Sequence, residues 1–206
     1  MPNPVIHSCQ VLDPGVGVSR IEIVSEGLKR GRQMGYSRSK IVDADNPGRV
    51  LALTKGQGIS IGTPPDGLQK MEANPLEIVD SPDLPPLWEV FGAGLRDDGR
   101  WALPRLSVDV ASPDAALHIG PQFVVLEAAA RHRAAEVAGT THLHGVASHV
   151  MFVARGKTGP FRVEAEPLPG ADGRIAVRVT MHDEGAGDRL TTVASYLFGR
   201  AGQAAD

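Results

Sequence analysis

Residues 117–130 read Leu-His-Ile-Gly-Pro-Gln-Phe-Val-Val-Leu-Glu-Ala-Ala-Ala and introduce the one long helix that the sequence predicts, over residues 121–138. Pro121 stands at its first position and Gly139 directly follows its end, which is the usual asymmetry of helix termini. Small side chains in this helix would let a sheet close tightly around it. The alanines concerned are Ala128, Ala129, Ala130, Ala134, Ala135 and Ala138.

Strand-like segments lie on both sides of this helix. Residues 101–110 precede it, and no helical period of useful length occurs in residues 5–63, where segments such as 20–24 alternate as a half-buried strand does. The predicted order over the second half of the chain is therefore one strand, the long helix and four strands. The four later strands are expected at 145–154, 161–168, 174–182 and 190–198.

An internal repeat connects the two regions. Residues 20–32 align without a gap with residues 162–174, and both read as a strand, a turn and a Gly-Arg pair that opens the next strand. An acidic loop follows each copy, at 43–49 and at 183–189, and ends in arginine before an apolar strand. We interpret this pattern as a duplication whose first copy has no counterpart of the long helix.

The chain is expected to have three parts. Residues 1–63 form a partial β-meander, and residues 100–206 form a complete unit of helix and sheet. Residues 64–99 form a linker that is rich in proline, with a short helix that begins with proline near residues 84–92. Trp88 and Phe91 would anchor this short helix.

A long helix between strands, followed by a four-strand meander, resembles the hotdog fold, in which an antiparallel sheet wraps around one central helix. The chain is also similar to hotdog thioesterases of the PaaI type, which carry His-Gly-Gly at the helix entrance and an acid nine residues after that histidine. Here His118 and Gly120 match, Glu127 stands at the position of the acid, and Ile119 replaces the first glycine. The resemblance implies an α+β hotdog domain, and the partial first unit gives a tandem arrangement similar to double-hotdog acyl-CoA thioesterases of the TesB type.

This resemblance implies hydrolysis of an acyl-CoA thioester. Glu127 would act as the general base or as the nucleophile, and the sequence does not choose between these roles. Gly120 permits close approach of a substrate, and its N–H at the positive end of the helix suits a developing oxyanion. His118 would position the substrate or order the loop at the helix entrance.

Substrate contacts are expected close to this helix and on the strand after it. Gln122 offers its backbone N–H or its side-chain amide, and Phe123 shares a helix face with the catalytic acid. Ser148 and His149 lie where hotdog thioesterases often carry a polar residue that orients water or the carbonyl. The basic cluster at residues 29–32 suits the phosphates of coenzyme A, or is a solvated turn.

Other interpretations of the same residues are open. Glu127 and Arg131 have the spacing of an exposed ion pair on a helix. The incomplete first repeat and Ile119 favour a hotdog module without catalytic activity, which binds acyl-CoA or acts only in assembly. A hotdog dehydratase is disfavoured, because no Asp-x-Asn-Pro is followed two residues later by histidine. A metal site at His142, His144 and His149 is disfavoured, because no carboxylate or cysteine stands nearby.

Composition excludes several further classes. The 206 residues are 42% hydrophobic and 22% charged, which is ordinary for a globular protein, and the net charge of −3 indicates neither nucleic acid nor an anionic membrane as a partner. The single cysteine, Cys9, excludes an intrachain disulfide and a zinc site with several cysteines.

We expect no cofactor and no metal. No secretory signal and no apolar run of about 20 residues is visible, so we expect a cytoplasmic protein. Because hotdog sheets usually pair side by side, the resemblance also implies a homodimer.

Overall fold

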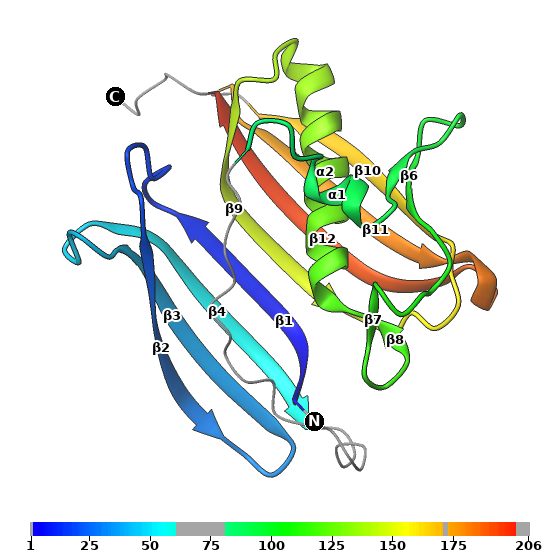
Figure 1. Ribbon diagram of the computed structural model, residues 1–206, viewed down its shortest axis with the longest axis horizontal. Helices are drawn as coiled ribbons and strands as arrows, with labels where there is room; N and C mark the ends of the chain where they lie inside the picture. Colours follow the sequence, from blue (N-terminus) through cyan, green and yellow to red (C-terminus); the bar gives the residue numbers. More distant parts are fainter. Residues whose placement is uncertain (1, 61–80, 171–172, 201–206) are drawn as a thin grey trace.

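The computed structural model describes residues 2–60, 81–170 and 173–200, which form a long antiparallel sheet with one long helix packed on it (Figure 1). Ten strands cross this sheet in the order β2-β3-β4-β1-β9-β12-β11-β10-β6-β5. A separate short hairpin, made of β7 (Ala111–Ser112) and β8 (Ala116–Leu117), precedes the helix. The α+β architecture predicted from the sequence is confirmed.

Two halves of four strands each meet at the centre of the sheet. In each half the strand that comes first in the chain lies at the centre, and the fourth, third and second strands follow outward. The two central strands pair in antiparallel orientation, with Ser8 opposite His149. This shared order agrees with the aligned segments of the sequence, while the duplication itself stays a prediction. The first half contains β1 (Pro2–Val11), β2 (Ile21–Arg30), β3 (Met34–Asp43) and β4 (Val50–Ser60), and the second contains β9 (Leu143–Phe152), β10 (Phe161–Pro169), β11 (Ile175–Asp183) and β12 (Arg189–Arg200).

The long helix, α2 (Ile119–Ala138), begins two residues earlier than the sequence predicted. His118 is its N-cap, and its imidazole Nδ1 accepts a hydrogen bond of 3.1 Å from the backbone N–H of Gly120. Pro121 is therefore the third helical residue, a position where a missing N–H removes no helical hydrogen bond. Gly139 ends the helix as predicted, with the positive φ of 66° that glycine adopts without strain.

The core lies between α2 and the second half of the sheet. Ala129, Ala130 and Ala134 have no exposed surface, and neither do Val125 and Leu126. Their small or branched side chains pack on β10, β11 and β12, as the alanine pattern predicted. The sheet contributes large apolar side chains to this contact, namely Val163, Val177, Val179, Met181 and Phe198.

The segment between the two halves is less regular than the sequence predicted. The strand expected at 101–110 is limited to β6 (Trp101–Leu103), because Pro104 has no N–H to donate to a sheet. The short helix α1 (Leu87–Val90) follows Pro86, and Trp88 contacts Trp101 edge-to-face with ring centroids 5.0 Å apart. β5 (Gly94–Leu95) pairs with β6 at the sheet edge. Most of the predicted linker, residues 61–80, lies outside the described residues.

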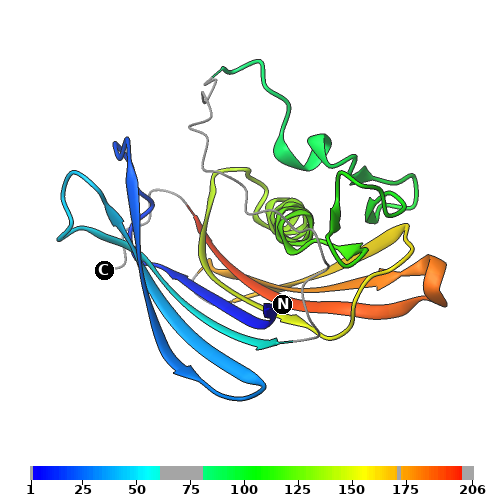
Figure 2. The ribbon, with the colours of Figure 1, turned by 60° about the horizontal axis from the view of Figure 1, so that its bottom comes forward.

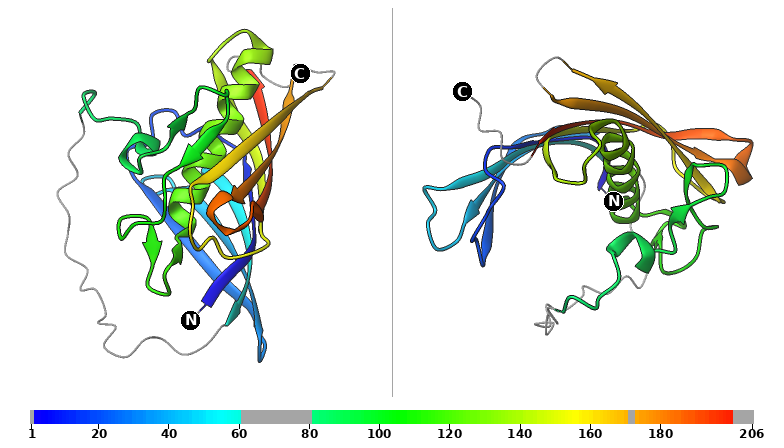
Figure 3. Two further views of the ribbon diagram at one scale, coloured as in Figure 1. Left: turned by 90° about the vertical axis from the view of Figure 1, so that its right-hand side faces the viewer. Right: turned by 90° about the horizontal axis from the view of Figure 1, so that it is seen from above.

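The first half of the sheet carries no helix on the side where α2 lies, as far as the described residues show (Figures 2 and 3). Register places Ile23, Ile41 and Cys9 on this side. Ile23 is 60% exposed, and small hydroxyl side chains stand beside it, with the Oγ atoms of Ser25 and Ser39 2.9 Å apart. The two halves therefore share a strand order but differ in what covers them.

Asp183 holds the loop that follows β9 against the end of β11. Its carboxylate is fully buried and accepts hydrogen bonds from the backbone N–H groups of Lys157, Thr158 and Gly159, at 2.7, 3.0 and 2.7 Å. The first residue of the second predicted acidic loop therefore has a structural role, since its carboxylate binds the backbone of residues 157–159.

We expect Asp183→Ala to lower the free energy of unfolding by about 3 kcal/mol, because one buried and two partly buried N–H donors lose their acceptor. Urea denaturation monitored by circular dichroism measures this change. Asp97→Ala is the matched control, since Asp97 is exposed, and should change stability by less than about 0.5 kcal/mol. Equal stability of the two variants would contradict this account of the loop.

Candidate active site

The entrance of α2 contains three of the residues predicted for the site. The exposed His118 caps the helix and occupies the N–H of Gly120, the predicted oxyanion donor. The Gln122 side chain is buried: its Nε2 donates to the Leu117 carbonyl at 3.1 Å, and its Oε1 accepts from Thr192 Oγ1 at 2.6 Å. A cavity of about 180 Å³ adjoins these residues. In this arrangement the N–H of Gly120 and the side-chain amide of Gln122 already have hydrogen-bond partners.

Glu127 lies two turns further along α2, on the side that faces the uncovered half of the sheet. Its side chain is 53% exposed, and its Oε1 is 3.3 Å from Nη2 of Arg131. Arg131 is held in turn by a hydrogen bond of 2.8 Å to the Leu143 carbonyl. The ion pair suggested by the helix spacing is therefore present.

A row of polar side chains crosses the sheet below Glu127. Phe123, one turn before Glu127, contacts the ring of His7 at a centroid distance of 5.2 Å. Arg131, one turn after it, lies over the ring of Phe198 at 5.4 Å. The strand residues between these two contacts are Cys9, Ser148 and Tyr196, which stand opposite one another on β1, β9 and β12. We call these three residues the polar row.

The charge of Glu127 acts on two members of the polar row. Burial raises the pKa of the Cys9 thiol, and the nearby Glu127 carboxylate raises it further. Burial also raises the pKa of the Tyr196 hydroxyl, again with a smaller contribution from Glu127. Both groups are therefore held in their protonated, neutral forms.

Two buried polar atoms in this region have no hydrogen-bond partner among the described residues. They are Nδ1 of His7 and the hydroxyl of Tyr196. Burial lowers the pKa of His7, so its ring is neutral at pH 7. Neither residue is among those predicted for the site from the sequence. The available signal was the alternation of β12, which places a tyrosine between the buried positions Ala194 and Phe198.

The structure does not bring the predicted acid and the predicted oxyanion donor together. Gly120 and Glu127 are seven residues apart on one helix, which separates them by about 10 Å along its axis. A base and an oxyanion donor that serve one carbonyl must both lie about 3 Å from the reacting atoms. Within one chain, Glu127 therefore needs a donor other than the N–H of Gly120.

The two predicted strand residues lie on opposite faces of β9. Ser148 belongs to the polar row, on the side of α2. His149 points to the other face, since side chains alternate along a strand, and its Nδ1 is 2.8 Å from Oγ of Ser8. The sheet thus separates His149 from Glu127, and the expected contact of His149 with substrate beside Glu127 is not supported.

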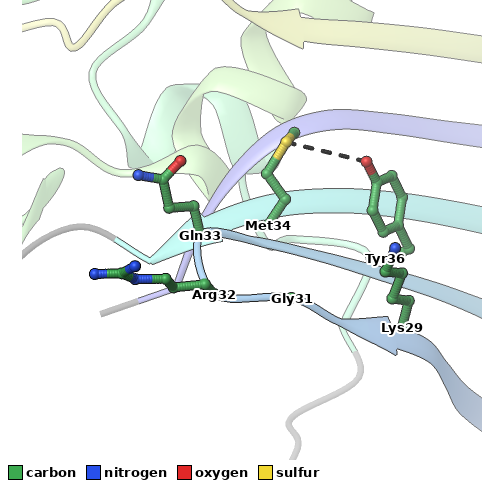
Figure 4. Close-up of a pocket in the computed structure, with 6 residues that line it drawn as sticks. All are labelled: Lys29, Gly31, Arg32, Gln33, Met34 and Tyr36. Atoms are coloured by element: carbon green, nitrogen blue, oxygen red, sulfur yellow. Dashed lines mark hydrogen bonds between the residues drawn. The ribbon is translucent and has the colours of Figure 1, made fainter.

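The predicted basic cluster lies at the turn between β2 and β3. Figure 4 shows Arg32 extending from this turn beside Gln33, while Met34 and Tyr36 lie along β3. A surface hollow of about 580 Å³ is lined there by Lys29 and its neighbours. This turn lies at the end of the sheet where α2 begins. Met34 pairs with Ile59, and Ile59 pairs with Asn3 on β1. Asn3 and the helix cap His118 line the same small cavity.

Comparison with solved structures identifies the fold. The acyl-CoA thioesterase II TesB2 of Mycobacterium marinum is 14% identical and superposes with a TM-score of 0.66 over 97% of this chain and 80% of its own. The tesB protein of Mycobacterium avium subspecies paratuberculosis gives 14% identity and 0.64, over 97% and 79%. A protein from Alicyclobacillus acidocaldarius, described as having a hot dog fold, gives 12% and 0.55, over 99% and 81%. The chain has the hotdog fold. No family model and no curated protein sequence matches it.

The described part of this hotdog protein contains no group of three or more side chains arranged to hold a metal ion. Within the same residues, no helix is both long enough and apolar enough to cross a membrane.

The pKa of the Cys9 thiol tests whether Glu127 lies close to the polar row. We expect Glu127→Gln to lower the pKa of Cys9, because the negative charge is removed, while burial keeps that pKa above the ordinary value. The rate of iodoacetamide alkylation, measured against pH, gives this pKa directly, since Cys9 is the single cysteine of the chain. Glu136→Gln, on another face of α2, should leave the profile unchanged. A profile that does not move in Glu127→Gln would place Glu127 away from the polar row.

Proposed function

We propose that this hotdog protein hydrolyses acyl-CoA thioesters, with Glu127 as the catalytic carboxylate. The proposal depends above all on the position of Glu127 on the flank of α2 beside the core face, over the polar row. The carboxylate is accessible to solvent, whereas in the row beneath it Tyr196 is buried and Cys9 and Ser148 are half-buried. The likeness to solved thioesterases supports the fold on which this chemistry is proposed.

Two routes are compatible with this placement. As a general base, Glu127 takes a proton from water, the hydroxide adds to the carbonyl carbon, and the C–S bond breaks to give a carboxylic acid and a thiol. As a nucleophile, Glu127 displaces the thiol to form an anhydride, which water then hydrolyses. In a single turnover in H₂¹⁸O, label in the Glu127 side chain identifies the anhydride route, because water has then attacked the Glu127 carboxyl carbon of the anhydride, whereas the general-base route labels only the product acid.

The basic turn between β2 and β3 is proposed to hold the phosphates of coenzyme A. Lys29, Arg30 and Arg32 have no carboxylate partner within the described residues, and their turn lies at the sheet end where α2 begins. Lysine and arginine suit phosphate groups by charge and by hydrogen bonding. The acyl end would then extend toward the polar row.

A second candidate function has its own support. The N–H of Gly120 is occupied by His118, Glu127 is paired with Arg131, and the described part of the first half has no helix. These features favour a hotdog module that binds acyl-CoA without hydrolysing it, or that acts only in assembly. The homodimer stays a prediction from the resemblance, and the cytoplasmic location stays a prediction from the sequence.

We expect Glu127→Gln to reduce kcat for acyl-CoA hydrolysis at least about 100-fold, because the variant has neither a base nor a nucleophile at this position. Thiol release from a panel of acyl-CoAs with short to long chains measures the rate. Glu136→Gln is the control, since Glu136 pairs with Arg133 on the same helix away from the polar row. Binding of acyl-CoA by the wild type without turnover of any member of the panel would favour the second candidate instead.

A double substitution, Lys29→Glu with Arg32→Glu, tests the phosphate site. We expect it to raise KM for acyl-CoA about tenfold or more, because attraction to the phosphates becomes repulsion. The KM for the matching acyl-pantetheine thioester, which lacks the nucleotide phosphates, should not change. Lys40→Glu, an exposed residue of β3 away from the turn, is the matched control. An unchanged KM for acyl-CoA would show that the phosphates bind elsewhere.

A further inference from the structure

The hydroxyl of Tyr196 is an exception to the way this protein satisfies its buried polar groups. Tyr196 is 6% exposed, and its Oη has no hydrogen-bond partner among the described residues. The other buried hydroxyls near α2 are paired, since Thr191 donates to the Met181 carbonyl and Thr192 donates to Gln122. Buried side-chain donors in folded proteins are nearly always paired, so an unpaired one needs an explanation.

The ring of Tyr196 is fixed, and it is placed at the catalytic carboxylate. It stacks on Phe198 with an interplanar angle of 16° and a centroid distance of 6.3 Å, and Arg131 lies over Phe198. Tyr196 stands on β12 at the level of Glu127, between the contacts that Phe123 and Arg131 make with the sheet. Contacts of the ring therefore fix the position of the hydroxyl, and no hydrogen bond of the hydroxyl is needed for this.

The hydroxyl is also kept as a donor. Its pKa is raised by burial and, to a smaller degree, by the Glu127 carboxylate, so the proton stays on the oxygen throughout the physiological range. No hydrogen bond joins it to Glu127 in the described structure, so its donor is unused. A thioester carbonyl has the two properties that a carboxylate and a phenol O–H can act on together, since its oxygen accepts a hydrogen bond and its carbon accepts a nucleophile.

We infer that the Tyr196 hydroxyl donates a hydrogen bond to the carbonyl oxygen of the thioester on which Glu127 acts, and so serves as the oxyanion donor of this site. This inference rests on the proposed hydrolysis of acyl-CoA. It supplies the donor that Gly120 is too distant to provide. Tyr196 is then a catalytic residue contributed by the last strand of the sheet, opposite the helix that carries the acid.

The step balances with water as the only co-reactant. In the general-base route, Glu127 takes one proton from water, and the O–H electron pair forms the new bond to the carbonyl carbon. The electrons of the C=O π bond move to the oxygen, where Tyr196 stabilises the charge by its hydrogen bond. They return as the C–S bond breaks, and the thiolate receives a proton from Glu127 to leave as coenzyme A.

Tyr196→Phe removes only the hydroxyl and keeps the ring on Phe198. We expect kcat for acyl-CoA to fall about 100- to 1,000-fold with little change in KM, which is the usual cost of losing one oxyanion donor. The melting temperature should not fall, because the hydroxyl makes no hydrogen bond to any of the described residues. Glu136→Gln is the control, since Glu136 pairs with Arg133 on α2 away from the polar row. Active wild type with kcat preserved in Tyr196→Phe would overturn the inference and leave the proposed function intact.

A binding experiment separates failure of the inference from failure of the proposed function. S-(2-oxopropyl)-CoA keeps a carbonyl next to the sulfur-bearing carbon, and S-propyl-CoA lacks it. We expect calorimetry to show that Tyr196→Phe weakens binding of the ketone about fivefold or more and leaves binding of S-propyl-CoA unchanged. The binding comparison does not require turnover. An inactive wild type would therefore refute the proposed hydrolysis, and the affinities for the two analogues could still be measured. Equal affinities of wild type and Tyr196→Phe for the ketone would overturn the role of Tyr196 as a carbonyl donor.

Discussion

The packing of the alanine face of α2 on the second half of the sheet is the contact on which the rest of the structure depends. Ala129, Ala130 and Ala134 have no exposed surface, so the helix backbone lies close to the strands and has no freedom to rotate about its axis. Any larger side chain on this face would push the helix away from the sheet. Fixing this face also fixes the direction of every other side chain on the helix.

The placement of Glu127 follows from that contact. With the alanine face toward the core, Phe123, Glu127 and Arg131 share the adjoining flank of the helix, and they stand at successive levels along the strands. Phe123 and Arg131 each contact an aromatic ring of the sheet, whereas Glu127 stands over the polar row. The same rigid geometry keeps Gly120 about two turns away, so the helix supplies the acid and the sheet must supply its complement.

The two halves of the sheet show how one strand order serves two different surfaces. In the second half, large apolar side chains pack on α2 and form the core. In the first half, the corresponding face carries small hydroxyl side chains and exposed isoleucines. The seam between the halves, where β1 pairs with β9, is where the polar row meets a partly exposed flank of the helix. A site of this kind combines an accessible carboxylate with one buried donor, Tyr196, and two half-buried ones.

The sequence by itself determined the helix, its glycine stop, the later strands and the position of the acid, because hydrophobic periodicity and turn residues are local signals. It also placed the two aligned units, although Pro104 shortened one predicted strand and the helix starts at Ile119 instead of Pro121. Only the tertiary structure decided which groups surround Glu127. Cys9 and Tyr196 come from strands at opposite ends of the chain, and each stands opposite Ser148 in the sheet. Their proximity depends on strand order and register, which long-range pairing sets more than any local pattern does. Strand alternation likewise separated His149 from Ser148, and the capping geometry of His118 engaged Gly120, so neither outcome was visible in the order of residues alone.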